Sequence, residues 1–160
     1  MRWHLIGHLQ TNKVKYIIDK VHMIHSVDSV KLMSEIERQA EKHGVEQINI
    51  LIQVNISKEE TKFGIDIDEV DAMLEFAKGL KHVKVCGFMT ILAKIDSEMS
   101  ARLQFRDINN KFIDISRNKY DNIDMKFLSM GMSGDFEIAI EEGSNMVRVG
   151  TAIFGARDYS

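Results

Sequence analysis

The strongest constraint on the fold of this chain is an alternation of short apolar runs with amphipathic segments. The runs have the length of buried strands, and the segments between them repeat apolar residues at helical spacing. The clearest run, residues 48–56, reads Ile-Asn-Ile-Leu-Ile-Gln-Val-Asn-Ile and is too apolar for a sheet with one face in water. Six such units in succession predict a parallel sheet with right-handed crossovers, either doubly wound or curled into a barrel.

Local signals set the expected boundaries of these elements. Polar residues that can cap a helix precede the amphipathic segments, and glycines follow three of them. The expected strands are residues 3–6, 23–25, 48–56, 83–90, 126–130 and 146–149. The expected helices run from Thr11 or Asn12 to Val21, from Asp28 to Gly44, from Asp66 or Asp68 to Gly79, from Ser97 to Arg117, and from Ser133 or Gly134 to Gly143.

Loops rich in glycine and hydroxyl residues follow the last two expected strands. Residues 127–135 read Phe-Leu-Ser-Met-Gly-Met-Ser-Gly-Asp, and residues 146–155 read Met-Val-Arg-Val-Gly-Thr-Ala-Ile-Phe-Gly. Adjacent parallel strands that end this way gather backbone N–H groups and hydroxyls around one point, which suits a dianionic phosphate. The loops after strands seven and eight of a (β/α)₈ barrel form such a site, often with a short extra helix.

These loops favour the barrel over the doubly wound sheet. A whole (β/α)₈ barrel takes about 250 residues and eight units, whereas this chain has 160 residues and about six units. The pattern therefore predicts a partial barrel that lacks its beginning, with residues 1–160 as a single incomplete domain. Two of eight strands would be missing, so open sheet edges and self-association through them are expected.

Composition narrows the class of partner. The hydrophobic fraction of 44% and the charged fraction of 28% are those of a soluble globular protein, and the net charge of −3 indicates neither nucleic acid nor an anionic membrane. No run of about 18 apolar residues and no signal-like start is present, so a cytoplasmic location is expected. The single cysteine, Cys86, lies in an apolar run and is expected to be a buried thiol.

The spacing of residues gives little support for a metal site, a hydrolase site or a nucleotide-binding site. His4 and His8 would lie about 13 Å apart on an extended segment, too far for one ion, and no Cys/His spacing supports a metal site. A structural role is therefore expected for each histidine. Residues 131–135, Gly-Met-Ser-Gly-Asp, miss the nucleophile elbow of hydrolases by their last residue. Dinucleotide and nucleoside triphosphate motifs are absent.

Five motifs resemble the pyridoxal phosphate homeostasis protein family. They are Trp-His-Leu-Ile-Gly-His-Leu-Gln-Thr-Asn-Lys (3–13), Leu-Ile-Gln-Val-Asn-Ile-Ser (51–57) with Lys62 and Gly64, Gly-Phe-Met-Thr (87–90), Leu-Ser-Met-Gly-Met-Ser (128–133) and Val-Arg-Val-Gly-Thr-Ala-Ile-Phe-Gly-Ala-Arg (147–157). The resemblance runs in order through 1–160. It implies a barrel similar to the N-terminal domain of alanine racemase, pyridoxal 5′-phosphate (PLP) as the cofactor, no enzymatic turnover, and a role in intracellular PLP homeostasis.

The resemblance also implies which part of the barrel is present. The lysine that forms the Schiff base with PLP in this family lies on the first strand, upstream of the motif at 3–13. The chain therefore resembles strands three to eight of an N-terminally truncated barrel. Lys13, Lys15 and Lys62 do not match that lysine, so the Schiff-base lysine is expected to be missing from this chain.

Seven residues are expected to bind the cofactor because they match the family motifs. The Ser129 hydroxyl would face the phosphate. Arg148 would face the pyridine nitrogen, which a permanent hydrogen-bond donor keeps unprotonated, and this suits a holder of the cofactor better than a versatile catalyst. The other five form the two phosphate loops: Gly131, Met132 and Ser133 in the first, Gly150 and Thr151 in the second.

Each assignment has a simpler alternative. Glycines at strand ends are most often turns, and an arginine is most often exposed or salt-bridged. A charged residue inside the apolar run 146–149 is unusual, and this favours a role for Arg148 in contacting a ligand. Lys62 is either a second lysine near the site or a solvated loop residue, and Asn55 and Met89 are expected only to line the pocket.

Three functions remain open at this point. The first is a non-catalytic PLP-binding protein without its Schiff-base lysine. The second is a PLP-dependent enzyme of the racemase or decarboxylase type, which would need a catalytic lysine and a second domain. The third is a chain without ligand-binding competence. The family resemblance favours the first.

Overall fold

A computed structural model describes residues 1–59, 61–92, 97–118 and 120–155. Ala156 and Arg157, the end of the last motif, lie outside these ranges. The strands are β1 (His4–Leu5), β2 (Met23–Val27), β3 (Ile48–Gln53), β4 (Val83–Met89), β5 (Ile123–Met132) and β6 (Met146–Arg148). The helices are η1 (Thr11–Tyr16), α1 (Val30–His43), η2 (Ile67–Glu69), α2 (Val70–Ala77), α3 (Glu98–Ser116), α4 (Phe136–Glu141) and α5 (Thr151–Phe154).

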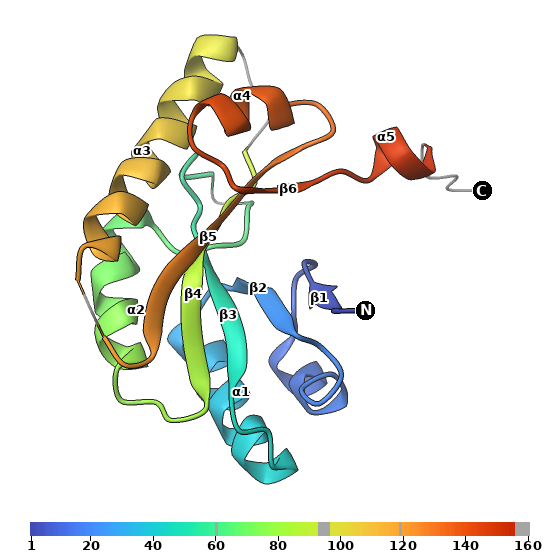
Figure 1. Ribbon diagram of the computed structural model, residues 1–160, viewed down its shortest axis with the longest axis vertical. Coiled ribbons are helices and arrows are strands. Elements are labelled where there is room, and N and C mark those ends of the chain that lie inside the picture. The colour runs from blue at the N-terminus through green and yellow to red at the C-terminus, as the bar shows by residue number, and fades with distance from the viewer. Residues whose placement is uncertain (60, 93–96, 119, 156–160) are drawn as a thin grey trace.

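The six strands form one parallel sheet in the order β1-β2-β3-β4-β5-β6. Every strand pairs with its neighbour in sequence, which is the order of a barrel wall and not that of a doubly wound sheet, whose order reverses at a switch point. Figure 1 shows the sheet curled, with α1, α2 and α3 on its outer side. The predicted partial barrel of six strand–helix units is confirmed.

The apolar residues of the strands serve two cores. Ile50 and Ile52 point into the large core between the sheet and the outer helices, whereas Leu51 joins a small cluster on the concave face. That inner cluster consists of Met23, Leu51, Cys86 and Met89, with Phe127 packed against it. Both faces of β3 are therefore buried, which accounts for its nearly continuous apolar sequence.

Cys86 lies in this inner cluster and is buried, as the sequence predicts. Burial raises the pKa of its thiol to about 11. The thiol is therefore protonated at neutral pH and is a poor nucleophile.

A glycine allows β4 and β5 to approach closely. Gly87 has φ of +143°, and a Cβ at this position would lie 1.8 Å from the carbonyl oxygen of Phe127. The register of the two strands shifts between Val85 and Gly87. No other residue type fits here without displacing backbone, so the glycine of the motif at 87–90 has a structural role.

The start of β4 is held by a carboxylate from α1. Glu37 accepts hydrogen bonds from the backbone N–H groups of Lys81, His82 and Val83, with shortest distances of 2.8, 2.9 and 3.0 Å. These N–H groups precede or begin the strand, and a carboxylate accepts such bonds strongly. The contact connects an outer helix to the entry of an inner strand.

Several predicted boundaries need correction. The expected helix to Val21 is only the short 3₁₀ helix Thr11–Tyr16, because its N-cap residue Gln10 makes no capping bond and its interior carries β-branched residues of low helix propensity. The strand expected to reach Ile56 ends at Gln53, because Val54 pairs with Ile65 of the following loop. Helix α4 begins at Phe136, two or three residues after the expected start.

Candidate functional site

The loops after β5 and β6 lie next to each other at the carboxyl ends of the strands. The backbone N–H of Ala152 donates a hydrogen bond of 3.4 Å to Ser133 Oγ, which joins the two loops directly. Within β5 and β6, Met132 pairs with Arg148. The short helix α5 starts at Thr151, immediately after the second loop. The structure thus brings together the two segments that the sequence singles out.

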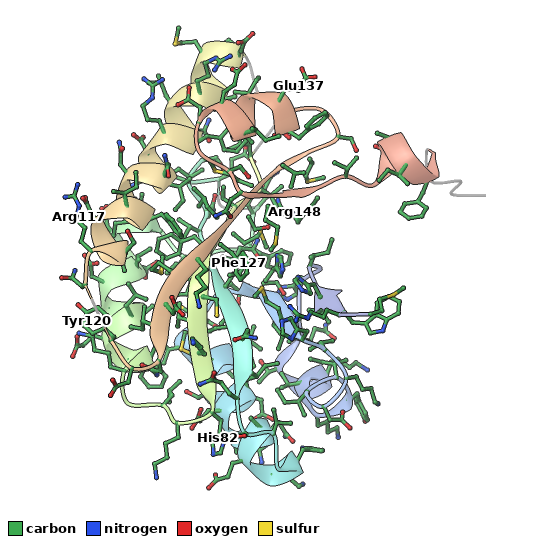
Figure 2. The ribbon with its side chains drawn as sticks, in the orientation of Figure 1. His82, Arg117, Tyr120, Phe127, Glu137 and Arg148 are labelled. Carbon is green, nitrogen blue, oxygen red and sulfur yellow. The ribbon has the colours of Figure 1, made fainter. Side chains whose placement is uncertain are left out.

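Arg148 occupies the concave side of the curled sheet, away from α2 and α3 (Figure 2). Its Nη1 donates a hydrogen bond of 2.7 Å to Ser129 Oγ, and its Nη2 donates one of 2.8 Å to the carbonyl oxygen of Thr90. Neither acceptor is charged, and among the described residues no carboxylate lies within 4.0 Å of the guanidinium. Arg148 is therefore a half-buried cation without a salt bridge to any residue that the structure describes.

A guanidinium has five N–H donors, and only two of those of Arg148 are used in the contacts above. Burial lowers the pKa of Arg148 to about 10, and the charge of Asp135 opposes this shift. The side chain is still a cation at neutral pH. An acceptor on a ligand would meet N–H groups that the described part of the protein leaves free.

Ser129 lies beneath Arg148 and is fully buried. Its hydroxyl contacts Arg148 on one side and Nδ1 of His25, at 3.2 Å, on the other. His25 Nε2 lies 3.0 Å from Nδ1 of His4. A continuous polar chain therefore crosses the concave face from β6 through β5 and β2 to β1.

The two histidines in this row of hydrogen bonds, His4 and His25, are neutral. Burial, followed by the charges of His4 and Arg148, lowers the pKa of His25 to about 4. The pKa of His4 is also lowered, first by burial and then by the charges of His22 and Arg2. Neutral imidazoles can both donate and accept, which is what a chain of hydrogen bonds requires.

The remaining predicted residues lie in the two loops, with different environments. Gly131 has φ of +93°, and a Cβ there would lie 2.6 Å from Cβ of Ala139, so packing against α4 already requires a glycine. The N–H of Met132 donates to Asp135 Oδ1 at 2.6 Å. Gly150 and Thr151 are exposed, and a Cβ at Gly150 would meet no atom within 4 Å.

Lys62 connects two other loops at the same end of the sheet. It is half-buried, and its Nζ donates a hydrogen bond of 3.3 Å to the carbonyl oxygen of Leu92. The neighbouring Phe63 stacks on the His8 ring with centroids 3.7 Å apart. Asn55 donates to the carbonyls of Glu59 and Lys62, so its side chain shapes its own loop.

Sequence reasoning missed the part played by His4 and His25. The sequence predicts a structural role for each histidine but not the contacts that join His4, His25 and Ser129. In the part of the chain that the structure describes, no three His, Cys, Asp or Glu side chains are placed to hold an ion. One signal was present in the sequence. His25 stands within β2, all of whose residues are buried, and a buried polar side chain needs a partner.

No helix among the described residues has both the length and the apolarity to cross a bilayer.

Comparison with known proteins gives a consistent result. The sequence matches the family "alanine racemase, N-terminal domain" over residues 1–158. It is 43% identical over 159 residues to the pyridoxal phosphate homeostasis protein of Aquifex aeolicus, covering 99% of this chain and 68% of that protein. The homologue of Escherichia coli K12 is 38% identical over 161 residues, covering 100% of this chain and 67% of that protein.

Solved structures agree with the sequence comparison. PipY from Synechococcus elongatus, determined with PLP bound, superposes with a TM-score of 0.85 at 30% identity, covering 97% of this chain and 71% of PipY. Alanine racemase from Corynebacterium glutamicum superposes with a TM-score of 0.68 at 15% identity, covering all of this chain and 43% of the racemase, and shows the shared fold alone. The chain belongs to the pyridoxal phosphate homeostasis protein family, with the alanine racemase N-terminal type of barrel.

Proposed function

We propose that this chain binds PLP without catalysing a reaction and serves intracellular PLP homeostasis in the cytoplasm. Its relatives carry that role in their name, and PipY has been solved with the cofactor. The chain spans about two thirds of the length of the curated relatives, so the binding proposed is that of the residues present here.

The observation that carries this proposal is the state of Arg148. A half-buried guanidinium without a carboxylate within 4.0 Å among the described residues carries a desolvation cost that an acceptor on a ligand would offset. The pyridine nitrogen of PLP is such an acceptor. Donation from a permanent cation would keep this nitrogen unprotonated and the ring a weak electron sink.

The phosphate would lie against the two adjoining loops. Ser133 and Thr151 offer hydroxyls there, and the open space at Gly150 lets the backbone approach an anion. Gly131 and Met132 would lie beside it, whereas the buried Ser129 hydroxyl, which contacts Arg148 and His25, would act through Arg148. Since the N–H of Met132 is bonded to Asp135, its contribution requires that bond to open.

When bound, PLP supplies an aldehyde that reacts reversibly with amines. The chain's own residues would orient its ring and phosphate. We expect the Schiff-base lysine to be missing from this chain, as the family motifs imply, so its affinity would come from phosphate and ring contacts alone. This combination fits a holder of the cofactor.

Titration calorimetry of the whole chain with PLP tests the proposal. We expect saturable binding with one site, weakened about tenfold or more in Arg148→Gln because hydrogen bonds to a charged group are lost. Arg117→Gln is the matched control, since Arg117 is exposed and forms an ion pair with Asp114 of α3. Equal affinity of wild type and Arg148→Gln would show that the cofactor is held elsewhere.

The proposed lack of a Schiff-base lysine has its own test. Borohydride reduction of the mixture with PLP, followed by peptide mass mapping, should give scattered substoichiometric labelling of surface lysines. One stoichiometric adduct at a single lysine would contradict the proposal and would reopen the enzyme alternative. If the chain is folded but shows no saturable binding, the third alternative, a protein without ligand-binding competence, would be favoured.

A further inference from the structure

The row of hydrogen bonds from Arg148 to His4 has a direction that follows from the guanidinium, which can only donate. Arg148 has no acceptor, so its Nη1–H donates to Ser129 Oγ. The Ser129 hydroxyl can still donate one hydrogen bond. In the described part of the protein, the acceptor within reach is Nδ1 of His25, at 3.2 Å. Because Ser129 is fully buried, leaving that hydrogen without an acceptor would be costly.

This assignment sets the tautomers of both histidines. If Nδ1 of His25 accepts from Ser129, the ring hydrogen is on Nε2, which donates across 3.0 Å to Nδ1 of His4. His4 then carries its hydrogen on Nε2. Ser129 and His25 thus each accept one hydrogen bond and donate the next, between Arg148, which only donates, and His4, which accepts.

We propose that His25 is a positioning residue for the cofactor site: by accepting from Ser129, it holds the serine oxygen toward Arg148 and so fixes the guanidinium on the concave face. His4 supports it by selecting its Nε2–H tautomer. The inference rests on the proposed function insofar as Arg148 meets the cofactor. The hydrogen bonds themselves are formed in the protein without ligand.

This row of hydrogen bonds depends on a neutral His25. A proton on Nδ1 would replace the acceptor by a donor and would place a second cation beside Arg148. The charged and titratable groups that act on His25 are His4 from β1 and Arg148 from β6, and His22 and Arg2 act on His4. All are cations when charged, and together with burial they favour the neutral imidazole.

Side-chain substitutions separate positioning from mere packing. His25→Asn places an amide oxygen near the site of Nδ1 and can still accept from Ser129, whereas His25→Leu fills the space without an acceptor. If His25 acts through Ser129, Ser129→Ala should remove the effect of His25→Leu. Thermal unfolding monitors whether each variant is folded.

Nuclear magnetic resonance on the unliganded whole chain provides the first readout. Long-range proton–nitrogen correlations of the imidazole rings in wild type should show His25 with Nδ1 unprotonated and Nε2 protonated. The Arg148 Nη–H signals should be protected from exchange with water. His25→Asn should keep that protection and His25→Leu should lose it. An Nδ1–H tautomer in wild type would overturn the proposal even if neither variant folds, as would unchanged Arg148 signals in His25→Leu.

Binding of 4-deoxypyridoxine 5′-phosphate, which has no aldehyde to react with lysines, provides the second readout. The dissociation constant should rise about tenfold in His25→Leu, the effect of one weakened hydrogen bond to a charged group, and stay within about threefold in His25→Asn. Equal losses in both variants would contradict a role through Ser129. If wild type binds no ligand, the proposed function fails, and the unliganded spectra still decide the role of His25.

Discussion

At the scale of single residues, the site is built around a cation with neutral partners. Arg148 is fixed by a hydroxyl and a carbonyl, and among the described residues no carboxylate lies within 4.0 Å to neutralise it. A salt bridge there would stabilise the cation and occupy the donors that a ligand needs. The arrangement therefore keeps both the charge and the free N–H groups available on the concave face.

The buried His25 predicts a pH dependence of stability. Its ordinary pKa of 6.5 is lowered to about 4 in the fold. Between these values the unfolded chain binds a proton that the folded chain does not, so the free energy of unfolding should fall as the pH drops from about 6.5 to 4, by up to about 3 kcal/mol. Above pH 6.5 this contribution is fully present.

Denaturant unfolding at a series of pH values checks this expectation. His25→Asn should flatten the slope between pH 6.5 and 4, whereas His43→Asn, at the exposed end of α1, is the matched control. The same slope in wild type and His25→Asn would mean that other groups cause the acid sensitivity.

The candidate residues could be named from the sequence, but their contacts could not. The motif at 147–157 and the lone charge in an apolar strand point to Arg148. The partnership of His25 with Ser129 joins residues 104 positions apart, and it depends on which ring nitrogen faces the hydroxyl. Spacing along one strand carries no information of that kind.

At the scale of elements, the β4–β5 pair depends on the absence of one side chain. Gly87→Ala would add a Cβ 1.8 Å from the Phe127 carbonyl oxygen at a φ of +143°. We expect a loss of about 3 kcal/mol in the free energy of unfolding, from combined overpacking and backbone strain.

Chemical denaturation of Gly87→Ala measures this loss. Gly7→Ala is the control, since a Cβ at Gly7 would meet no atom within 4 Å. Similar stabilities of the two variants would show that β4 and β5 can separate there at little cost.

The contact between α1 and β4 predicts a second element-scale effect. Glu37→Gln keeps one acceptor oxygen but removes the charge that holds three backbone N–H groups, and should cost about 2 kcal/mol of unfolding free energy. Glu41→Gln on the exposed face of the same helix should stay within about 0.5 kcal/mol. Equal effects at both positions would indicate that the carboxylate does not hold the strand.

Helix ends were the elements most readily predicted. Ser97 caps α3, Asp66 caps η2 and donates its backbone N–H to Glu69 Oε2, and Gly44 ends α1 in the left-handed conformation. These signals are local. Strand ends depend on neighbours, which is why β5 extends to Ile123–Met132 rather than residues 126–130.

At the scale of the whole molecule, the curled sheet has two outer strands. Within the described residues, β1 pairs only with β2 and β6 pairs only with β5. The apolar residues Trp3 and Ile6, which flank β1, are 64% and 48% exposed. Unpaired parallel edges with apolar neighbours favour pairing with another chain.

We therefore expect concentration-dependent self-association in light scattering, accompanied by shallow unfolding at low temperature. The double variant Trp3→Glu, Ile6→Lys should reduce the association, and Leu103→Lys, exposed on α3, should not. A monomeric wild type that melts cooperatively would contradict the prediction.

The central claim is that one PLP molecule lies between the two C-terminal loops with its ring nitrogen on Arg148. Amide and arginine side-chain shifts of the isotope-labelled chain, followed during titration with 4-deoxypyridoxine 5′-phosphate, test it most directly. The account predicts saturable changes concentrated at residues 129–133 and 148–152 and at the Arg148 guanidinium. Saturable changes centred elsewhere, with Arg148 unaffected, would contradict it.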